Sequence, residues 1–182
     1  MEIGNQINGK SVRVWKTAKE IQEGISKAAL KINEKFKNVK EPIIVIGILN
    51  GAFIFCSDLV RELNFDFKID FIKMSSYSEN KQTDTISYNL NLKYSIENCH
   101  IIIAEDIIDS GKTMELTISL LTAMKPLSYT VCTLISKPLK NFPESISSHT
   151  VSIFDYPNNY VVGYGLDDNE TLRHLRDIYL YE

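Results

Sequence analysis

The sequence lacks the features that mark secreted, membrane-spanning and nucleic-acid-binding proteins. It has only three cysteines, Cys56, Cys99 and Cys132, and no Cys-x-x-Cys pair, which excludes a disulfide framework and a thiolate zinc site. No apolar run approaches the roughly 20 residues that span a bilayer, and MEIGNQINGK at the N-terminus does not resemble a signal peptide. The net charge of −3 provides no basic field for nucleic acid or an anionic membrane. We therefore expect a cytoplasmic protein with three buried, unreactive thiols.

The chain does contain alternating helix and strand patterns, with no repeat or flexible linker. Its 182 residues suit one domain. Apolar residues at helical spacing predict a helix from Thr17, its N-cap, to residue 36. Apolar and alternating runs predict strands at 43–48, 67–77, 88–93, 100–106 and 129–136, with helices at 52–63 and 112–125. This order indicates an α/β domain with a mostly parallel central sheet flanked by helices.

The carboxyl ends of the predicted strands carry the residues of interest, because parallel sheets bind ligands at that edge. IIIAEDIIDSGKT, residues 101–113, passes from a strand into a helix. The first N–H groups of that helix and Gly111 favour a phosphate. Glu105 and Asp106 end the strand and suit the hydroxyls of a sugar phosphate or a Mg²⁺ ion. Asp109 lies in the turn, where it could act as a base.

This stretch has two other possible interpretations. The Gly-Lys-Thr end resembles a nucleotide-hydrolase phosphate loop, but that loop needs a glycine where this chain has Asp106. The nucleotide-hydrolase interpretation therefore fails. The second interpretation is a solvated acidic turn in which Asp109 or Ser110 caps the helix.

The stretch resembles the ribose-phosphate signature of type I phosphoribosyltransferases. Four further segments resemble the hypoxanthine-guanine branch of that family: GILNGAFIF, DFIKMSSYS, LISKP and YVVGYGLDDNETLRHL. The match runs in order from about residue 40 to the end. It implies one domain, 1–182, with a core at about 40–155 and a small hood from 1–15 and 156–182. It also implies a homodimer or homotetramer that binds small molecules.

The resemblance implies transfer of a phosphoribosyl group from phosphoribosyl pyrophosphate to hypoxanthine or guanine, with Mg²⁺. Asp109 would be the general base at purine N7, and Ser76 and Tyr77 would begin a lid. Glu105, Asp106 and Asp167 would serve the metal. The remaining roles follow the motifs: phosphoribosyl binding by Glu105, Asp106, Ile107, Ile108, Asp109, Ser110, Gly111, Lys112 and Thr113; purine binding by Lys137, Tyr160, Val161 and Asp167; pyrophosphate binding by Asn50, Gly51 and Arg173.

Several positions depart from the family pattern. Asn50 stands where many relatives have a basic residue, Asp168 where an aromatic residue is usual, and Tyr160 where Phe is commoner. The segment SIFDYPNN also differs. These departures leave the preferred base open among hypoxanthine, guanine and xanthine. Two alternatives to the hypoxanthine-guanine enzyme are a non-catalytic regulator that senses purines or phosphoribosyl pyrophosphate, and a transferase for another base.

Overall fold

A six-stranded sheet forms the centre of the molecule. The structure, a computed structural model, describes residues 6–7, 9–77 and 85–182. The strand order is β5-β4-β3-β6-β7-β8. Every neighbouring pair is parallel except β4 with β5. The strands are β3 (Ile43–Leu49), β4 (Lys68–Tyr77), β5 (Thr85–Asn89), β6 (His100–Ile108), β7 (Ser128–Ser136) and β8 (Thr150–Asp155). The predicted α/β class with a mostly parallel sheet is confirmed.

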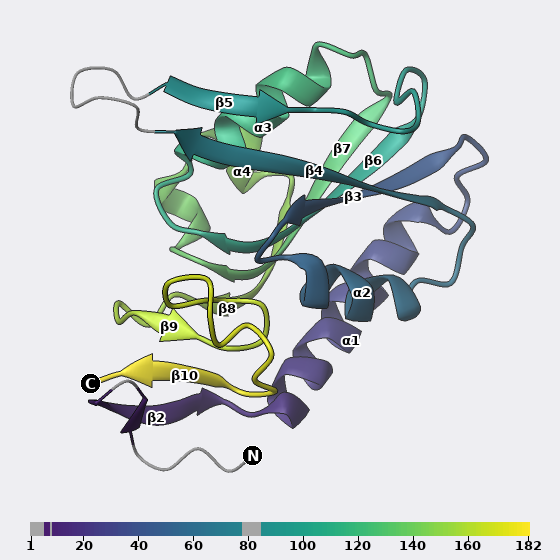
Figure 1. The fold of residues 1–182 in the computed structure, drawn as a ribbon. Helices are drawn as coiled ribbons and strands as arrows, with labels where there is room; N and C mark the ends of the chain where they lie inside the picture. Colours follow the sequence, from purple (N-terminus) through teal and green to yellow (C-terminus); the bar gives the residue numbers. More distant parts are fainter. Residues whose placement is uncertain (1–5, 8, 78–84) are drawn as a thin grey trace.

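Helices cover both faces of this sheet (Figure 1). Helices α1 (Ala18–Phe36) and α2 (Phe53–Arg61) pack on one face, while α3 (Lys112–Thr122) and α4 (Glu144–Ser147) pack on the other. A 3₁₀ helix, Leu139–Asn141, precedes α4. Thr17 caps α1 as predicted: its hydroxyl accepts from the Glu20 N–H at 3.3 Å, and the Glu20 carboxylate accepts from the Thr17 N–H at 2.9 Å.

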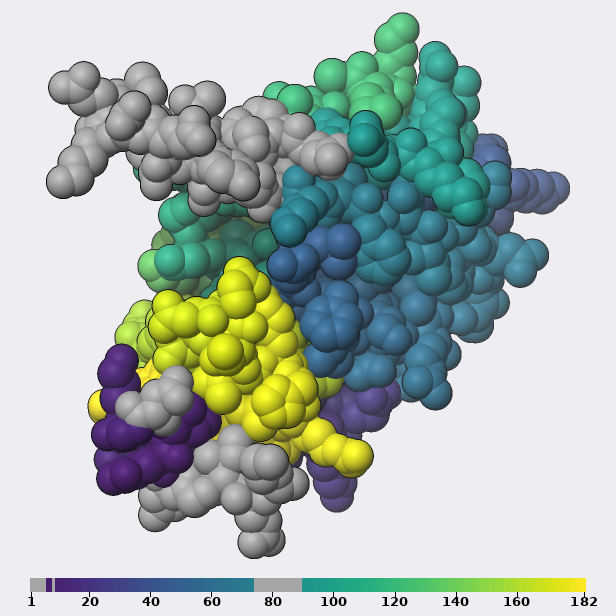
Figure 2. Space-filling model, in the orientation of Figure 1, coloured from purple at the N-terminus to yellow at the C-terminus, as the bar shows by residue number. Residues whose placement is uncertain are grey.

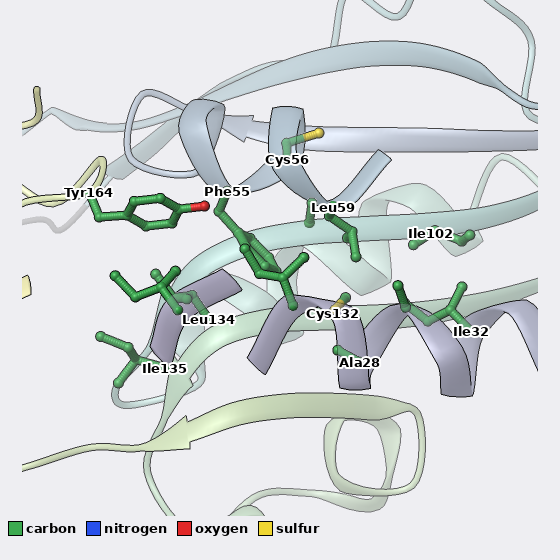
Figure 3. Close-up of a cluster of buried hydrophobic side chains, with 14 of the residues drawn as sticks. Ala28, Ile32, Phe55, Cys56, Leu59, Ile102, Cys132, Leu134, Ile135 and Tyr164 are labelled. Atoms are coloured by element: carbon green, nitrogen blue, oxygen red, sulfur yellow. The ribbon is translucent and has the colours of Figure 1, made fainter. Parts of the chain in front are cut away.

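Burial on both faces explains why the central strands are continuous apolar runs. Along β3, Ile43 and Val45 face α1 and α2, whereas Ile44 and Ile46 face the cluster around α3. Figure 3 shows the first of these cores, in which side chains of α1 and α2 meet those of β6 and β7.

The three cysteines are free and buried, as expected. Burial raises the pKa of the Cys56 thiol to about 11. Burial, and secondarily the neighbouring Cys56, raise the pKa of the Cys132 thiol to about 12. Both thiols therefore remain protonated at neutral pH.

A second, antiparallel sheet joins the two ends of the chain. Its order is β1-β2-β10-β9, with β1 (Gln6–Ile7), β2 (Lys10–Lys16), β9 (Val161–Val162) and β10 (Ile178–Tyr181). It has its own apolar cluster, which includes Ile7, Val12 and Val162. The C-terminal segment lies against the N-terminal strand on one side and the region of α2 on the other (Figures 1 and 2).

Some predicted boundaries are wrong. The strand expected at 88–93 lies earlier, because β5 spans Thr85–Asn89 and pairs antiparallel with β4. Beyond it the chain leaves the sheet, and the buried Asp70 carboxylate accepts from the N–H groups of Lys93 at 2.6 Å and Tyr94 at 3.2 Å. Helix α3 ends at Thr122, before the expected end at residue 125. Within the described ranges, no helix is long and apolar enough to cross a membrane.

Candidate active site

Several residues expected to be functional, among them Gly51, Glu105 and Lys137, lie at or just after the ends of β3, β6 and β7. The three strands are adjacent and parallel, so the loops that follow them emerge at one edge of the sheet. The loop after β6 forms a cavity of about 250 Å³. It is lined by Glu105, Ile107, Ile108, Asp109, Ser110, Gly111, Thr113 and Met114.

Gly111 shapes the floor of this cavity. It precedes α3 with a φ of +78°, in the region that favours glycine, and a Cβ there would lie 2.8 Å from the Phe142 ring. No side chain caps α3. The N-cap residue is Gly111, so the interpretation of Asp109 or Ser110 as the N-cap is wrong, although the Ser110 hydroxyl accepts from the Lys112 N–H at 3.5 Å. Thr113 and Met114, in the first turn of α3, line the cavity. Such a helix start is suited to a phosphate.

Glu105 and Asp106 are two adjacent acids in a poorly solvated position. Glu105 is 9% exposed, and its Oε2 is buried without a hydrogen-bond partner among the described residues. Burial, followed by the Asp106 carboxylate, raises the pKa of Glu105 well above its usual value. Burial also raises the pKa of Asp106 to about 6, against the lowering effect of the Ile107 N–H, which donates to Oδ1 at 2.8 Å.

The loop after β3 leaves no room beside Asp106. A Cβ at Gly51 would lie 1.6 Å from Asp106 Oδ2. Only glycine therefore lets this loop reach the carboxylate. The Leu49–Asn50 peptide bond just before it is cis.

These acids fit Mg²⁺ that arrives with a substrate. Among the residues that the structure describes, no three acids, histidines or cysteines group closely enough to form a complete metal site. Mg²⁺ is commonly held by one or two carboxylates, with substrate oxygens and water completing the shell. The partnerless Oε2 of Glu105 and the crowded carboxylate of Asp106 match that donor set. Both oxygens of Asp167, by contrast, are engaged by protein groups.

Asp109 and Lys137, which were predicted on separate motifs, form an ion pair at the mouth of the cavity. A hydrogen bond from Lys137 to Asp109 raises the pKa of the lysine. Lys137 Nζ also lies 5.6 Å from the centre of the Tyr156 ring. The pair presents an acceptor and a donor side by side, next to an aromatic ring that the sequence did not indicate.

The C-terminal segment supplies Tyr160, Val161 and Asp167. The Tyr160 side chain, from a residue that is 56% exposed, donates its hydroxyl to the Asp167 carbonyl oxygen at 2.8 Å. Val161 lies in β9. Asp168, which replaces an aromatic residue of the family pattern, accepts from the Tyr181 hydroxyl at 2.9 Å. The aspartate at position 168 thus connects this loop to β10 by a hydrogen bond.

Arg173 connects the C-terminal segment to the loop after β3. Its Nη1 donates to the Gly165 carbonyl oxygen at 2.8 Å, and its Nη2 lies 2.9 Å from Asp167 Oδ1. Gly165 has a φ of +97°, and a Cβ there would lie 2.2 Å from the Gly51 carbonyl oxygen. The predicted pyrophosphate residues Gly51 and Arg173 are therefore brought together through Gly165.

The two residues expected to begin a lid lie at the end of β4. Ser76 and Tyr77 end β4 and pair with Ile86 and Thr85 of β5; most of the polar stretch that follows them, 78–84, lies outside the described residues.

Glu170, which sequence reasoning missed, contacts Arg173 Nη2 at 3.0 Å. An exposed glutamate in a charged loop carries no periodic or motif signal.

Comparisons with known proteins show the family and the fold of the chain. Residues 16–169 match the family model of the phosphoribosyl transferase domain. The chain is 34% identical over 166 residues to the hypoxanthine phosphoribosyltransferase of Buchnera aphidicola, covering 91% of this chain and 93% of the relative. It is 34% identical to the hypoxanthine-guanine-xanthine phosphoribosyltransferase of Tritrichomonas foetus, covering 90% and 87%. A solved structure of the Trypanosoma cruzi hypoxanthine enzyme superposes with a TM-score of 0.84 at 29% identity, covering 97% and 94%.

Proposed function

Since the chain belongs to the phosphoribosyltransferase family, in its hypoxanthine-guanine branch, we propose that it is a purine salvage enzyme. It transfers the 5-phosphoribosyl group of phosphoribosyl pyrophosphate to hypoxanthine or guanine. The products are the nucleoside monophosphate and pyrophosphate. The regulator alternative is not favoured, because the curated relatives are named as transferases.

The observation that carries this proposal is the Asp109–Lys137 pair. A 6-oxopurine protonated at N7 presents a donor, N7–H, beside an acceptor, the 6-oxo oxygen. Asp109 accepts from the first and Lys137 donates to the second. Adenine would place an amino donor against the Lys137 ammonium, which has no acceptor. The pair therefore selects 6-oxopurines over 6-aminopurines.

The bond changes follow from this placement. The purine N9 electron pair forms a bond to C1 of the ribose while the bond from C1 to the pyrophosphate oxygen breaks, and pyrophosphate leaves with that electron pair. The N7 proton moves to the Asp109 carboxylate. A positioned base of this kind contributes about 10²–10⁴-fold in rate.

The remaining groups position the two substrates. The cavity of residues 107–114 and the start of α3 receive the 5′-phosphate. Tyr160 offers an aromatic face to the purine, and Val161 its backbone. Glu105 and Asp106 would hold Mg²⁺ together with the ribose hydroxyls, and the ion would neutralise charge on the leaving pyrophosphate. Arg173 and the Asn50–Gly51 backbone bind that group, and Ser76 and Tyr77 begin a lid that excludes water.

We also propose a cytoplasmic homodimer or homotetramer. Three buried free thiols suit a reducing compartment, and the resemblance to the family supports self-association. Light scattering on the purified protein would give the mass of the assembly, and a monomer at all concentrations would contradict this part.

The test of the function is a panel of bases. The purified protein is incubated with phosphoribosyl pyrophosphate and Mg²⁺, together with hypoxanthine, guanine, xanthine, adenine or uracil. Nucleotide formation with hypoxanthine or guanine, and none with adenine, is the expected result. No nucleotide from either 6-oxopurine would refute the proposal, and preferential turnover of adenine or uracil would assign the enzyme to another base.

A further inference from the structure

The Glu170 carboxylate contacts Arg173, one of the residues expected to bind pyrophosphate. Its Oε2 lies 3.0 Å from Arg173 Nη2, the same nitrogen that lies 2.9 Å from Asp167 Oδ1. Arg173 Nη1 is engaged separately with the Gly165 carbonyl oxygen. One guanidinium nitrogen is thus shared by two carboxylates, and a phosphate that binds at Nη2 displaces one of them.

Exposure identifies the carboxylate that is easier to displace. The Glu170 side chain is 75% exposed, whereas those of Asp167 and Arg173 are 30% and 18% exposed. Asp167 is also held through Oδ2, which accepts from the Glu170 backbone N–H at 2.9 Å. An exposed ion pair contributes little to stability, and two charged oxygens of a phosphate can bind arginine more strongly.

Two further polar groups, Lys73 and the side chain of Asn50, lie close to the same carboxylate. Arg173, and more weakly Lys73 and the Asn50 side chain, lower the pKa of the Glu170 carboxyl. The Glu170 side chain therefore lies among two cations, Arg173 and Lys73, and the predicted pyrophosphate residue Asn50.

We infer that Glu170 is an internal counter-ion of Arg173 that pyrophosphate replaces, and that it sets the affinity of the site for phosphoribosyl pyrophosphate and for the pyrophosphate product. This inference rests on the proposed function. Glu170 keeps the guanidinium in position in the free protein, and its charge opposes the bound polyanion. It thereby weakens product binding as well as substrate binding, which favours release of pyrophosphate.

The test compares Glu170→Gln with a matched control, Glu34→Gln. Glu34 is also an exposed glutamate, 71% exposed, paired with a cation three residues later, Lys37, but it lies on α1. Both variants lose one negative charge. Steady-state kinetics give KM for phosphoribosyl pyrophosphate and for hypoxanthine, and calorimetry gives Kd for pyrophosphate with Mg²⁺.

For Glu170→Gln we expect KM for phosphoribosyl pyrophosphate and Kd for pyrophosphate to fall about three- to tenfold, the range for removing one nearby charge in a water-like medium. The gain should shrink below about twofold at 1 M salt, because charges are then screened. KM for hypoxanthine and the values for Glu34→Gln should stay within about twofold of the parent. Unchanged or weaker pyrophosphate binding in Glu170→Gln, or an equal gain in Glu34→Gln, would overturn the inference. Calorimetry needs no turnover, so the role of Glu170 is judged even if no purine proves to be a substrate.

Discussion

Replacing Asp106 by Asn should stabilise the protein while abolishing the proposed Mg²⁺-dependent activity. Asn has the same shape, so its Oδ1 can still accept from the Ile107 N–H, which donates to Asp106 Oδ1 at 2.8 Å. It removes a carboxylate whose pKa is raised by burial from 3.8 to about 6. A raised carboxyl pKa means that the folded protein binds more protons than the unfolded chain between these two values. Stability therefore falls as the pH rises through this window.

The magnitude follows from the shift. A difference of about two pKa units corresponds to about 3 kcal/mol at pH 8, where the carboxyl is ionised in both states. Asp106 is only partly buried as a whole residue, and partial solvation reduces the effect to about 1–3 kcal/mol. At pH 4, near the unfolded pKa, the folded carboxyl is already neutral and the gain should be less than about 1 kcal/mol.

Urea unfolding at pH 8 and at pH 4, in a metal chelator, measures this difference. The Asp106→Asn variant should gain stability over the parent at pH 8 and little at pH 4. Added Mg²⁺ with phosphoribosyl pyrophosphate should raise the melting temperature of the parent more than that of the variant. A variant that is less stable than the parent at pH 8, or equally stabilised at both pH values, would refute the argument from burial.

Three further predictions test other parts of the site. Asp109→Asn should lower kcat for hypoxanthine about 10²–10⁴-fold with the fold intact, because it removes the proton acceptor; an unchanged rate would exclude Asp109 as the base. Gly165→Ala should destabilise the protein by about 2–3 kcal/mol in urea unfolding, because φ at this residue is +97° and the new Cβ would meet the Gly51 carbonyl oxygen. A variant as stable as the parent would show that the two loops can separate freely. Cys56 and Cys132, with thiol pKa values raised to about 11 and 12, should not react with a thiol reagent at pH 8 until the chain is unfolded, and rapid labelling of the native protein would contradict their burial.

The central sheet was predictable because its sequence signal is local. Strands β3, β6 and β7 are buried on both faces, so each is rich in apolar residues, and β3 is a continuous apolar run. The placement of Glu105, Asp106 and Asp109 follows from the strand ends and the start of α3. These three residues lie at one edge of the sheet because β6 runs parallel to its neighbouring strands.

The second sheet gave no comparable signal. β9 has two residues and β10 has four, and β10 pairs with β2 from the opposite end of the chain. Short strands stabilised by distant partners have no periodicity to detect. The same applies to the loop between them, where Tyr164 and Leu172 have φ values of +51° and +72°. Residues other than glycine, asparagine and aspartate seldom adopt a positive φ without tertiary support.

That loop explains why base and pyrophosphate residues lie within one short motif. The Tyr160 hydroxyl donates to the carbonyl oxygen of Asp167, whose carboxylate pairs with Arg173. Arg173 in turn donates to the carbonyl oxygen of Gly165, which packs against Gly51. The Tyr160 ring is therefore connected to the Arg173 guanidinium through one residue, Asp167. Because these contacts join the two halves of the proposed substrate site, substitutions at Asp167 should change the affinities for purine and for pyrophosphate together.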